Sequence, residues 1–570
     1  MDAGKKTIGD IFNRTRILEI PFFQRSYVWD EKQWERMLED MENVCFSNKP
    51  YFLGSVILKQ QNTNTNYKVG DIRTVIDGQQ RLTTLNILFK VFCLKTNQNN
   101  LFDTFKTYYG DISLKHNHND IESFEKILNL DKLEELKNDN NNKIISAYNY
   151  FRNNLNIEKI NFDRILSNVL FVGIDLNKDE DEQQIFDTIN SLGVTLSTAE
   201  LLKNYFFNRD IESYNKFWKD IFEKDEEIKN YWDKKIFAGR LERTFIDLFF
   251  FSFLQIKIQE KELRVTTDDK IEFSKVEHLF ESYKKFIINY LNNNKNSILT
   301  EIKDYALIFK ENFDSDIIQK ELTGNSGIER INEIIFGLDN STLIPYVLYI
   351  LKNVEDENSR NELFEFIETF IMRRMIIHAN TKNYNQLFTD RLINNKILSK
   401  EGFVKFLEGQ EDKVNFLPSD VDLKNGFDNS ILINKQSAGI LYFIESKLRN
   451  SKHSTELKGV NQYSLEHLMP KKWENNWGKL TNQEETIKRN RKLLTLGNLA
   501  IITQPLNSSI RDADWKTKKE GKGDKKEGLN KYASSLETLN LFLVLEEWNE
   551  TEIENRATFL FEKAKEIWKI

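Results

Sequence analysis

A long stretch of helical periodicity, from about residue 210 to residue 400, most strongly limits what this chain can fold into. Apolar residues recur there at the three- and four-residue spacing of one helix face, and aromatic stripes at this spacing are more often core than cofactor site. Helix breakers are scarce, with 6 Pro and 22 Gly among 570 residues. We therefore expect a predominantly α-helical protein. The clearest examples are "LERTFIDLFFFSFLQI", "VEHLFESYKKFIINYL" and "RNELFEFIETFIMRRMII".

The chain is too long for one hydrophobic core, so we expect several domains. Its first part mixes strands with helices, whereas the part after about residue 415 breaks the helical pattern again. Strands are predicted at "YFLGSVIL", "TVID" and "NVLFVGIDL", and helices at "DEKQWERMLEDMENV" and "QRLTTLNILFKVFCL". These changes predict an α+β domain at 1–210, a helical middle at 211–414 and a C-terminal domain at 415–570.

Several features favour a cytoplasmic protein with no membrane partner. The N-terminus lacks the apolar run of a signal peptide. The most apolar segment, which begins at Phe245, is about half a membrane span and contains Asp247, so we expect a buried helix. The two cysteines, Cys45 and Cys93, are too few for a disulfide framework or a thiolate zinc site, and we expect both in the core.

The charge is unevenly distributed along the chain. The formal net charge is −7, but residues 488–531 hold twelve Lys and Arg against five Asp and Glu, a balance of +7, so the remainder sums to −14. A basic block on an acidic protein is a candidate phosphate-facing surface. A solvated run of charges is the alternative.

The segment "VIDGQQRLTTLNIL" places unusual residues at a predicted strand-to-helix turn. The helix N-terminus would offer free backbone N–H groups to an anion, and Gly78 would let the backbone approach it closely. Arg81 could bind a phosphate with two hydrogen bonds, and Gln79 and Gln80 could bind phosphate or sugar. Asp77 could hold magnesium or tie down the loop. A polar turn capped by its own side chains is the alternative.

A second Gln-Arg pair, Gln24 and Arg25, lies in "IPFFQRSYVW" beside Tyr27 and Trp29. Aromatic side chains next to a basic residue can stack on nucleobases, so Tyr27 is a candidate nucleic-acid contact. A place in the hydrophobic core is the alternative for both rings, and it is the interpretation we favour for Trp29.

A third group of polar residues lies near the C-terminus. Glu466 and His467 are adjacent in "SLEHLMP", Asn498 follows in "LGNLAII", and Asn507 begins a predicted helix, "NSSIRDADWKTKK". We expect a hairpin within "LLTLGNLAIITQPLN". For a lone Glu-His pair a structural or capping role is the usual explanation. The four-part pattern instead indicates a ββα-metal (HNH) nuclease, because phosphodiester hydrolysis needs a neutral imidazole as base and a hard divalent cation.

The N-terminal motifs resemble those of one enzyme family. "IPFFQRSYVW", "YFLGSVIL", "VIDGQQRLTTL" and "IFDTINSLGVTLSTAELLKN" occur in the order of the GmrS-like domain of GmrSD-type, modification-dependent (type IV) restriction endonucleases. That resemblance implies a ParB/sulfiredoxin-like fold and a loop that binds and hydrolyses NTP. The residues that correspond to this loop and its neighbours are Asp77, Gly78, Gln79, Gln80, Arg81, Gln24 and Arg25. The later motif is matched, without assigned roles, by Asn190, Gly193, Lys203 and Asn204.

The C-terminal pattern resembles the family's GmrD-like HNH domain. By that resemblance His467 is the general base, Glu466 is a metal ligand and Asn498 orients the imidazole. Asn507 would complete a site for Mg²⁺ or another divalent cation such as Mn²⁺. Lys518 or Lys519 would contact DNA phosphate. The chain departs from many HNH sites in having Glu466 where they have Asp, and in its 31-residue spacing from His467 to Asn498.

The whole resemblance implies an NTP-regulated DNA endonuclease of prokaryotic anti-phage defence that cleaves modified phage DNA. A homo-oligomer is a further candidate for its partners. Family members respond to glucosylated hydroxymethylcytosine or to phosphorothioate DNA, and no residue here selects between them. Two alternatives stay open: a nuclease that cuts RNA in abortive defence, and a ParB-like nucleotide-dependent DNA-binding regulator without cleavage. For Arg373 and Arg374, in the helical middle, we expect a buried or interdomain ion pair.

Overall fold

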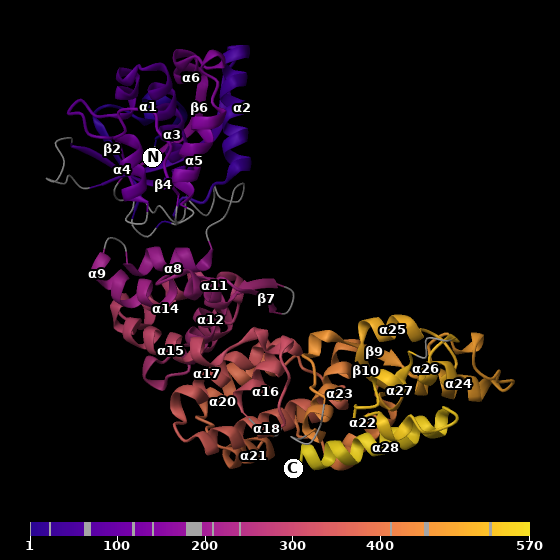
Figure 1. Cartoon of the computed structure of the whole chain (residues 1–570). Coiled ribbons are helices and arrows are strands. Elements are labelled where there is room, and N and C mark those ends of the chain that lie inside the picture. The colour runs from indigo at the N-terminus through magenta and orange to yellow at the C-terminus, as the bar shows by residue number, and fades with distance from the viewer. Residues whose placement is uncertain are drawn as a thin grey trace. The chain divides into compact units, whose positions relative to one another are not determined.

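The computed structural model describes two compact units, Met1–Lys216 and Phe217–Ile570 (Figure 1). It is mostly helical, at 61%, as the periodicity predicts. In the part of the chain that is described, no helix is long and apolar enough to cross a membrane. The three-domain division stays a prediction. The described residues are 2–21, 24, 26–61, 70–116, 120–138, 142–177, 197–207, 210–238, 241–325, 327–410, 413–449, 455–523 and 527–570.

A mixed six-stranded sheet organises the first unit, in the order β1-β6-β3-β4-β2-β5. The central strand β3 runs parallel to β6 and antiparallel to β4, and β2 runs parallel to β4 and β5. The three strands predicted from sequence are present as β3, β4 and β6. The bounds are β1 Asp2–Thr7, β2 Arg16–Glu19, β3 Tyr51–Gln60, β4 Asp71–Asp77, β5 Leu114–Lys115 and β6 Val169–Leu176.

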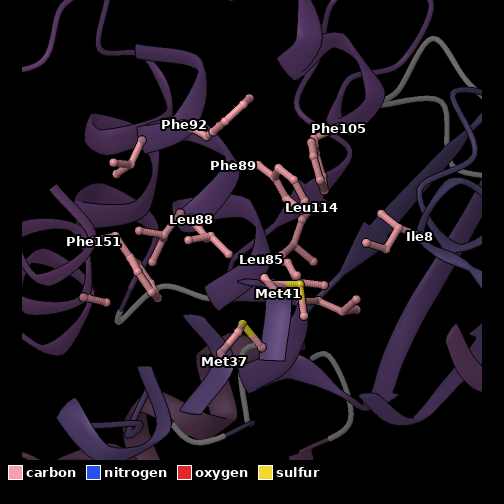
Figure 2. Packing of buried hydrophobic residues seen from close by; sticks show 14 of the residues in the cluster. Ile8, Met37, Met41, Leu85, Leu88, Phe89, Phe92, Phe105, Leu114 and Phe151 are labelled. Atoms are coloured by element: carbon pink, nitrogen blue, oxygen red, sulfur yellow. The ribbon is translucent and has the colours of Figure 1, made fainter. Parts of the chain in front are cut away.

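Helix α3 (Gln79–Thr96) forms the centre of the first unit's core. Its Leu85, Leu88, Phe89 and Phe92 lie among side chains from other helices, including Met37 (Figure 2). The helix is buried on nearly every face, which explains why the stretch from Leu85 to Leu94 is mostly apolar. Its first turn is thereby fixed at the end of β4.

The other helices of the first unit include α2, which begins after Asp30 as predicted. The Asp30 carboxylate accepts a hydrogen bond from the backbone N–H of Lys32 and caps the helix. Cys45 on α2 and Cys93 on α3 are free and buried, which confirms the expectation that both are core residues. The bounds are α1 Ile8–Ile11, α2 Glu31–Ser47, α4 Ile121–Leu128, α5 Lys143–Asn154, α6 Phe162–Asn168, α8 Thr198–Phe207 and α9 Ile211–Tyr214.

Helices fill the greater part of the second unit (Figure 1). The segment from Phe245 forms α12 (Phe245–Lys257), which is buried along its whole length, as predicted. A short hairpin, β7 Lys235–Ala238 and β8 Leu241–Thr244, was not predicted. The longer helices and those used below are α11 Glu226–Trp232, α13 Thr267–Phe273, α14 Leu279–Tyr290, α15 Leu299–Asn312, α16 Ile328–Asn332, α17 Ile344–Asn353, α18 Glu357–Ile376, α21 Lys400–Glu408, α22 Asp420–Asn429 and α23 Asn434–Leu448.

The C-terminal part contains a two-stranded antiparallel sheet, β9 (Tyr463–His467) and β10 (Leu499–Thr503). The prediction of a hairpin within "LLTLGNLAIITQPLN" is therefore wrong, because β10 pairs with a strand more than thirty residues earlier. Helix α25 (Gln504–Ile510) follows β10 directly, so Asn507 lies inside that helix and does not begin it. The remaining helices are α24 Gln483–Lys492, α26 Trp515–Glu520, α27 Leu529–Tyr532 and α28 Glu550–Ile567.

Candidate active site

The loop after β4 has the strand-glycine-helix geometry that the sequence predicts. Gly78 adopts a left-handed φ of 101°, and a Cβ there would lie 2.9 Å from Cγ2 of Val56, so both the conformation and the packing require glycine. Helix α3 begins at the next residue, and no described side chain caps its first turn. Helix N-termini of this kind can bind an anion through their first backbone N–H groups.

Arg81 and Asp77 form an ion pair at this loop. Nη2 of Arg81 donates to Oδ2 of Asp77 at 3.0 Å and to the Ser55 carbonyl at 2.8 Å, and Ser55 Oγ donates to the same Asp77 oxygen at 2.7 Å. The guanidinium lies against Gly54, where a Cβ would approach Nη1 to 3.1 Å. Both charged side chains keep 24% of their surface exposed, so the pair remains accessible from solvent.

Gln24 and Gln80 each form hydrogen bonds to the backbone of a neighbouring segment. Oε1 of Gln80 accepts from the backbone N–H of Val28 at 2.9 Å, and Gln24 donates to the carbonyls of Val75 and Ile76 at 2.9 and 3.0 Å. Both amides therefore fasten the segment around residues 24–29 to the β4–α3 turn. Gln79 is buried on α3. Arg25 lies outside the described residues, as do Asn190 and Gly193, whereas Lys203 and Asn204 lie on α8.

Tyr27 is a core residue in this structure and not a surface ring. It is 3% exposed, its hydroxyl lies 2.6 Å from Thr84 Oγ1, and Trp34 Nε1 donates to it at 2.8 Å. Burial raises its pKa well above the ordinary value. A nucleobase has no access to this ring, so the core alternative describes Tyr27 better than base stacking. Trp29 packs half-buried against the same core, as favoured from the sequence.

Pairing of β9 with β10 brings the C-terminal polar residues into one region. His467, the last residue of β9, lies directly opposite Leu499, the first residue of β10. Asn498 therefore immediately precedes the paired segment, and Asn507 follows it on α25. Asn507 Nδ2 donates to Leu465 O at 3.1 Å and to Ser464 Oγ at 2.9 Å, which fixes the helix on β9.

The imidazole of His467 is half-buried, and neither ring nitrogen forms a hydrogen bond or ion pair with any described residue. Burial, together with the positive charges of Lys471 and Lys518, lowers its pKa to about 4. The ring is therefore neutral near pH 7 and has a free nitrogen lone pair, which is the state a general base requires.

Glu466 forms a buried ion pair with Lys518 of α26. The Lys518 ammonium donates to Glu466 Oε1 and, at 2.7 Å, to the backbone carbonyl of His467. Burial raises the pKa of Glu466 and lowers that of Lys518, while the ion pair opposes both shifts. Because Lys518 is 0% exposed, its ammonium cannot reach a DNA phosphate in this structure. Lys518 instead holds the end of β9.

The side chain of Asn498 is fully buried, and both its oxygen and its nitrogen form hydrogen bonds within the protein. Its Oδ1 accepts from the backbone N–H of Met469 at 2.8 Å and from Trp548 Nε1 at 2.9 Å. Its Nδ2 donates to the carbonyls of Met469 and Leu493 at 2.8 and 2.9 Å. Asn498 thus fixes the backbone that follows His467, and none of these bonds reaches the imidazole itself.

Asn507 offers an oxygen that a divalent cation could use. Its Oδ1 accepts no hydrogen bond from the described residues. Glu466 provides the carboxylate of β9, and Lys518 binds its Oε1. Among the described residues no three or more His, Cys, Asp and Glu side chains gather as a metal cluster. This donor set fits magnesium, which takes few protein oxygens and completes its shell with water and phosphate oxygens.

Lys519 is also tied to the protein, since its ammonium donates to the carbonyl of Leu545 and lies over the Trp515 ring. Exposed basic side chains near it in the sequence are Arg511, Lys516 and Lys522. Sequence reasoning did not identify Trp548 or Arg556, which contact the Asn498 loop, because no local pattern links them to residues about fifty positions earlier.

Two family models match the chain. The model described as the N-terminal domain of GmrSD restriction endonuclease matches residues 8–207, which include the Asp77–Arg81 loop. The model described as the C-terminal domain of GmrSD restriction endonucleases matches residues 417–563, which include β9, β10 and α25. No curated protein sequence matches the chain.

Proposed function

The chain belongs to the GmrSD restriction endonuclease family, and from that premise we propose that it is an HNH-type, divalent-metal-dependent endonuclease that cleaves modified foreign DNA under the control of a nucleotide. Membership makes it a nuclease of restriction defence with DNA as its substrate. The HNH chemistry, the metal, the nucleotide and the modified target are the parts that this proposal adds.

The observation that carries the HNH assignment is the order strand, strand, helix around His467. β9 ends at His467, β10 pairs with it, and α25 brings Asn507 back against β9. This is the arrangement of a ββα-metal site, in which the base lies at a strand end and a ligand lies on the helix. Burial keeps the imidazole neutral, so it is ready to take a proton.

In the proposed reaction, His467 accepts a proton from a water molecule as that water attacks the scissile phosphorus. The ester bond from phosphorus to the departing sugar oxygen breaks, and that oxygen takes up a proton from solvent. Lys518 and Asn498 hold the backbone on which His467 lies, through the His467 carbonyl and Met469 respectively. Glu466 and Asn507 would hold Mg²⁺ or Mn²⁺, which would neutralise the charge developing on the phosphate. Exposed Lys516 and Lys522, rather than Lys518, would bind the DNA backbone.

The proposal for the nucleotide rests on the turn between β4 and α3. The N-terminus of α3 and the partly exposed Arg81 would bind the phosphates of an NTP, with Asp77 beside them. A ParB/sulfiredoxin-like fold for residues 1–210 agrees with a mixed sheet that ends at such a loop. Gln24 and Gln80 would support the loop from behind.

The test is digestion of plain, glucosyl-hydroxymethylated and phosphorothioate DNA with purified protein and Mg²⁺, with and without NTP. Cleavage of a modified DNA that NTP alters and that His467→Ala abolishes is the expected result. His278→Ala is the matched control, since His278 is an exposed histidine of the helical middle, and it should cut normally.

Cleavage that persists in His467→Ala would contradict the assigned base. Binding of NTP and DNA without any cleavage would favour the regulator alternative. An RNA substrate included in the same series separates the remaining alternative, because cutting of RNA alone would replace DNA as the target.

A further inference from the structure

Arg556, on α28, is a fully buried arginine that forms hydrogen bonds to the backbone of the Asn498 loop. Its Nη1 donates to three backbone carbonyls of that loop, and its Nε donates to Thr538 O at 3.0 Å. No carboxylate forms an ion pair with it among the described residues. The three loop acceptors are Leu499 O at 2.7 Å, Gly497 O at 2.9 Å and Leu496 O at 3.3 Å.

A buried cation with no direct ion pair is costly. The carboxylate of Glu445, which accepts from the Thr538 N–H, offsets part of the charge, but among the described residues the hydrogen bonds of Arg556 all go to backbone carbonyls. The carbonyls it binds flank Asn498 on both sides. A planar guanidinium can hold several acceptors in a fixed arrangement, which an ammonium on a flexible stem cannot reproduce. Arg556 therefore determines the path of the backbone at Asn498.

The same loop packs against α28 without any gap. A Cβ on Gly497 would lie 2.2 Å from the carbonyl oxygen of Ile553 and 3.0 Å from the Cβ of Ala557. Helix α28 thus approaches the loop so closely that only glycine fits at position 497. The contact lies one turn before Arg556, at Ile553, and next to it, at Ala557. Helix and loop form one rigid contact.

Asn498 transmits that position to the end of β9. Its backbone carbonyl accepts from the Leu468 N–H at 2.9 Å, and its side chain binds both backbone groups of Met469. These two residues directly follow His467. The Asn498 loop therefore holds the backbone that follows the imidazole, in addition to the bond from Lys518 to the His467 carbonyl.

We propose that Arg556 is a positioning residue of the nuclease: by fixing the Asn498 loop against α28, it fixes the strand end that carries His467. This inference rests on the proposed function for the role of His467. The contacts that link Arg556 to Met469 through the Asn498 loop are independent of that proposal. Arg556 touches neither substrate nor metal, and it acts only through Asn498.

The experiment compares Arg556→Lys with the full-length wild-type protein. The variant keeps the charge and loses the planar fork. We expect kcat for DNA cleavage to fall by about 10- to 100-fold with KM unchanged, because misplacing a catalytic group slows the chemical step without weakening binding. Backbone amide exchange at Leu468 and Met469, measured without substrate, should become about tenfold faster.

Arg374→Lys is the matched control. Arg374 is equally buried, on α18, and also donates to backbone carbonyls, those of Phe416 and Asn380, but it makes no contact with the Asn498 loop. It should lose comparable stability while exchange at Leu468 and Met469 stays as in the wild type. Trp548→Phe removes only the indole donor to Asn498, so it should lower kcat and speed the amide exchange in the same way as Arg556→Lys, but less. This variant replaces Arg556→Lys in the test if that protein does not fold.

Unchanged exchange at Leu468 and Met469 in both Arg556→Lys and Trp548→Phe would overturn the inference. So would a loss of kcat in Arg374→Lys as large as that in Arg556→Lys, since it would assign the effect to general destabilisation. If the wild type cuts no nucleic acid, the proposed function fails, and the exchange measurement still decides the role of Arg556.

Discussion

Trp568 donates its indole N–H to Oε1 of Glu368 at 2.9 Å, across 200 positions of the chain. Glu368 also pairs with Arg330 through both carboxylate oxygens, at 2.7 and 2.8 Å. Arg373, one turn along α18 from Glu368, donates to the Trp568 carbonyl at 2.6 Å and to Asp420. The ion pair expected for Arg373 is thus confirmed, and its bond to Trp568 joins α18 to the residue that follows α28. The same expectation for Arg374 is wrong, because among the described residues its guanidinium binds only two backbone carbonyls and the Tyr384 hydroxyl.

Glu368→Gln should destabilise the second unit by about 3–5 kcal/mol, because it leaves the buried Arg330 cation without its partner. Burial alone would raise the pKa of Glu368, but Arg330 and Trp568 hold it below its ordinary value, so the carboxylate is charged. Chemical denaturation measures the change. Glu365→Gln, an exposed position on the same helix, is the control and should stay within about 0.5 kcal/mol of the wild type.

Glu333→Gln should make stability less dependent on pH. Both carboxylate oxygens of Glu333 are buried without a partner among the described residues, and burial raises its pKa from 4.5 to about 7. Between these values the unfolded chain releases the proton and the folded chain keeps it, so wild-type stability falls as pH rises. The shift corresponds to about 3 kcal/mol above pH 7.

Urea denaturation at pH 5 and pH 8 tests this prediction. The glutamine variant should exceed the wild type in stability at pH 8 and approach it at pH 5, whereas the exposed Glu329→Gln should follow the wild type at both. A wild-type stability that rises from pH 5 to pH 8 by the same amount in all three proteins would contradict it.

Gly497→Ala should disturb the nuclease more than a glycine substitution normally does. The added methyl would meet the Ile553 carbonyl at 2.2 Å, so α28 or the Asn498 loop must move, at a cost of about 1–3 kcal/mol. Thermal unfolding measures the loss. Gly478→Ala, in the segment between β9 and β10, would meet no atom within 4 Å and should unfold at the wild-type temperature.

Arg81→Ala should weaken NTP binding by about tenfold or more, because a charge-assisted phosphate contact contributes about 1.5–3 kcal/mol. Its ion pair with Asp77 is partly exposed, so the fold should tolerate the loss. Isothermal titration with ATP and GTP gives the affinities. Arg36→Ala, at an exposed position of α2, is the control, and equal losses in the two variants would disprove a phosphate role for Arg81.

Local patterns carried much of the fold. The strands β3, β4 and β6, the helices α2, α3 and α12, and the polar turn at Gly78 follow from periodicity, capping and glycine chemistry, which depend on neighbours a few residues apart. The hairpin expected before Gln504 failed for the same reason: β10 is a strand, but its partner β9 lies far earlier in the chain. Register between distant strands is a tertiary property.

The sequence by itself determined the residue types of both candidate sites and their order along the chain, because the chemistry of phosphate binding and hydrolysis restricts which side chains can serve. Only the tertiary structure decided their environments. It buried Tyr27 and Lys518, turned Asn498 toward Met469, and left the His467 imidazole free and neutral. Lys518 lies on a short helix, and its burial depends on the carboxylate that folding brings to it. That carboxylate belongs to Glu466, 52 residues away in the sequence.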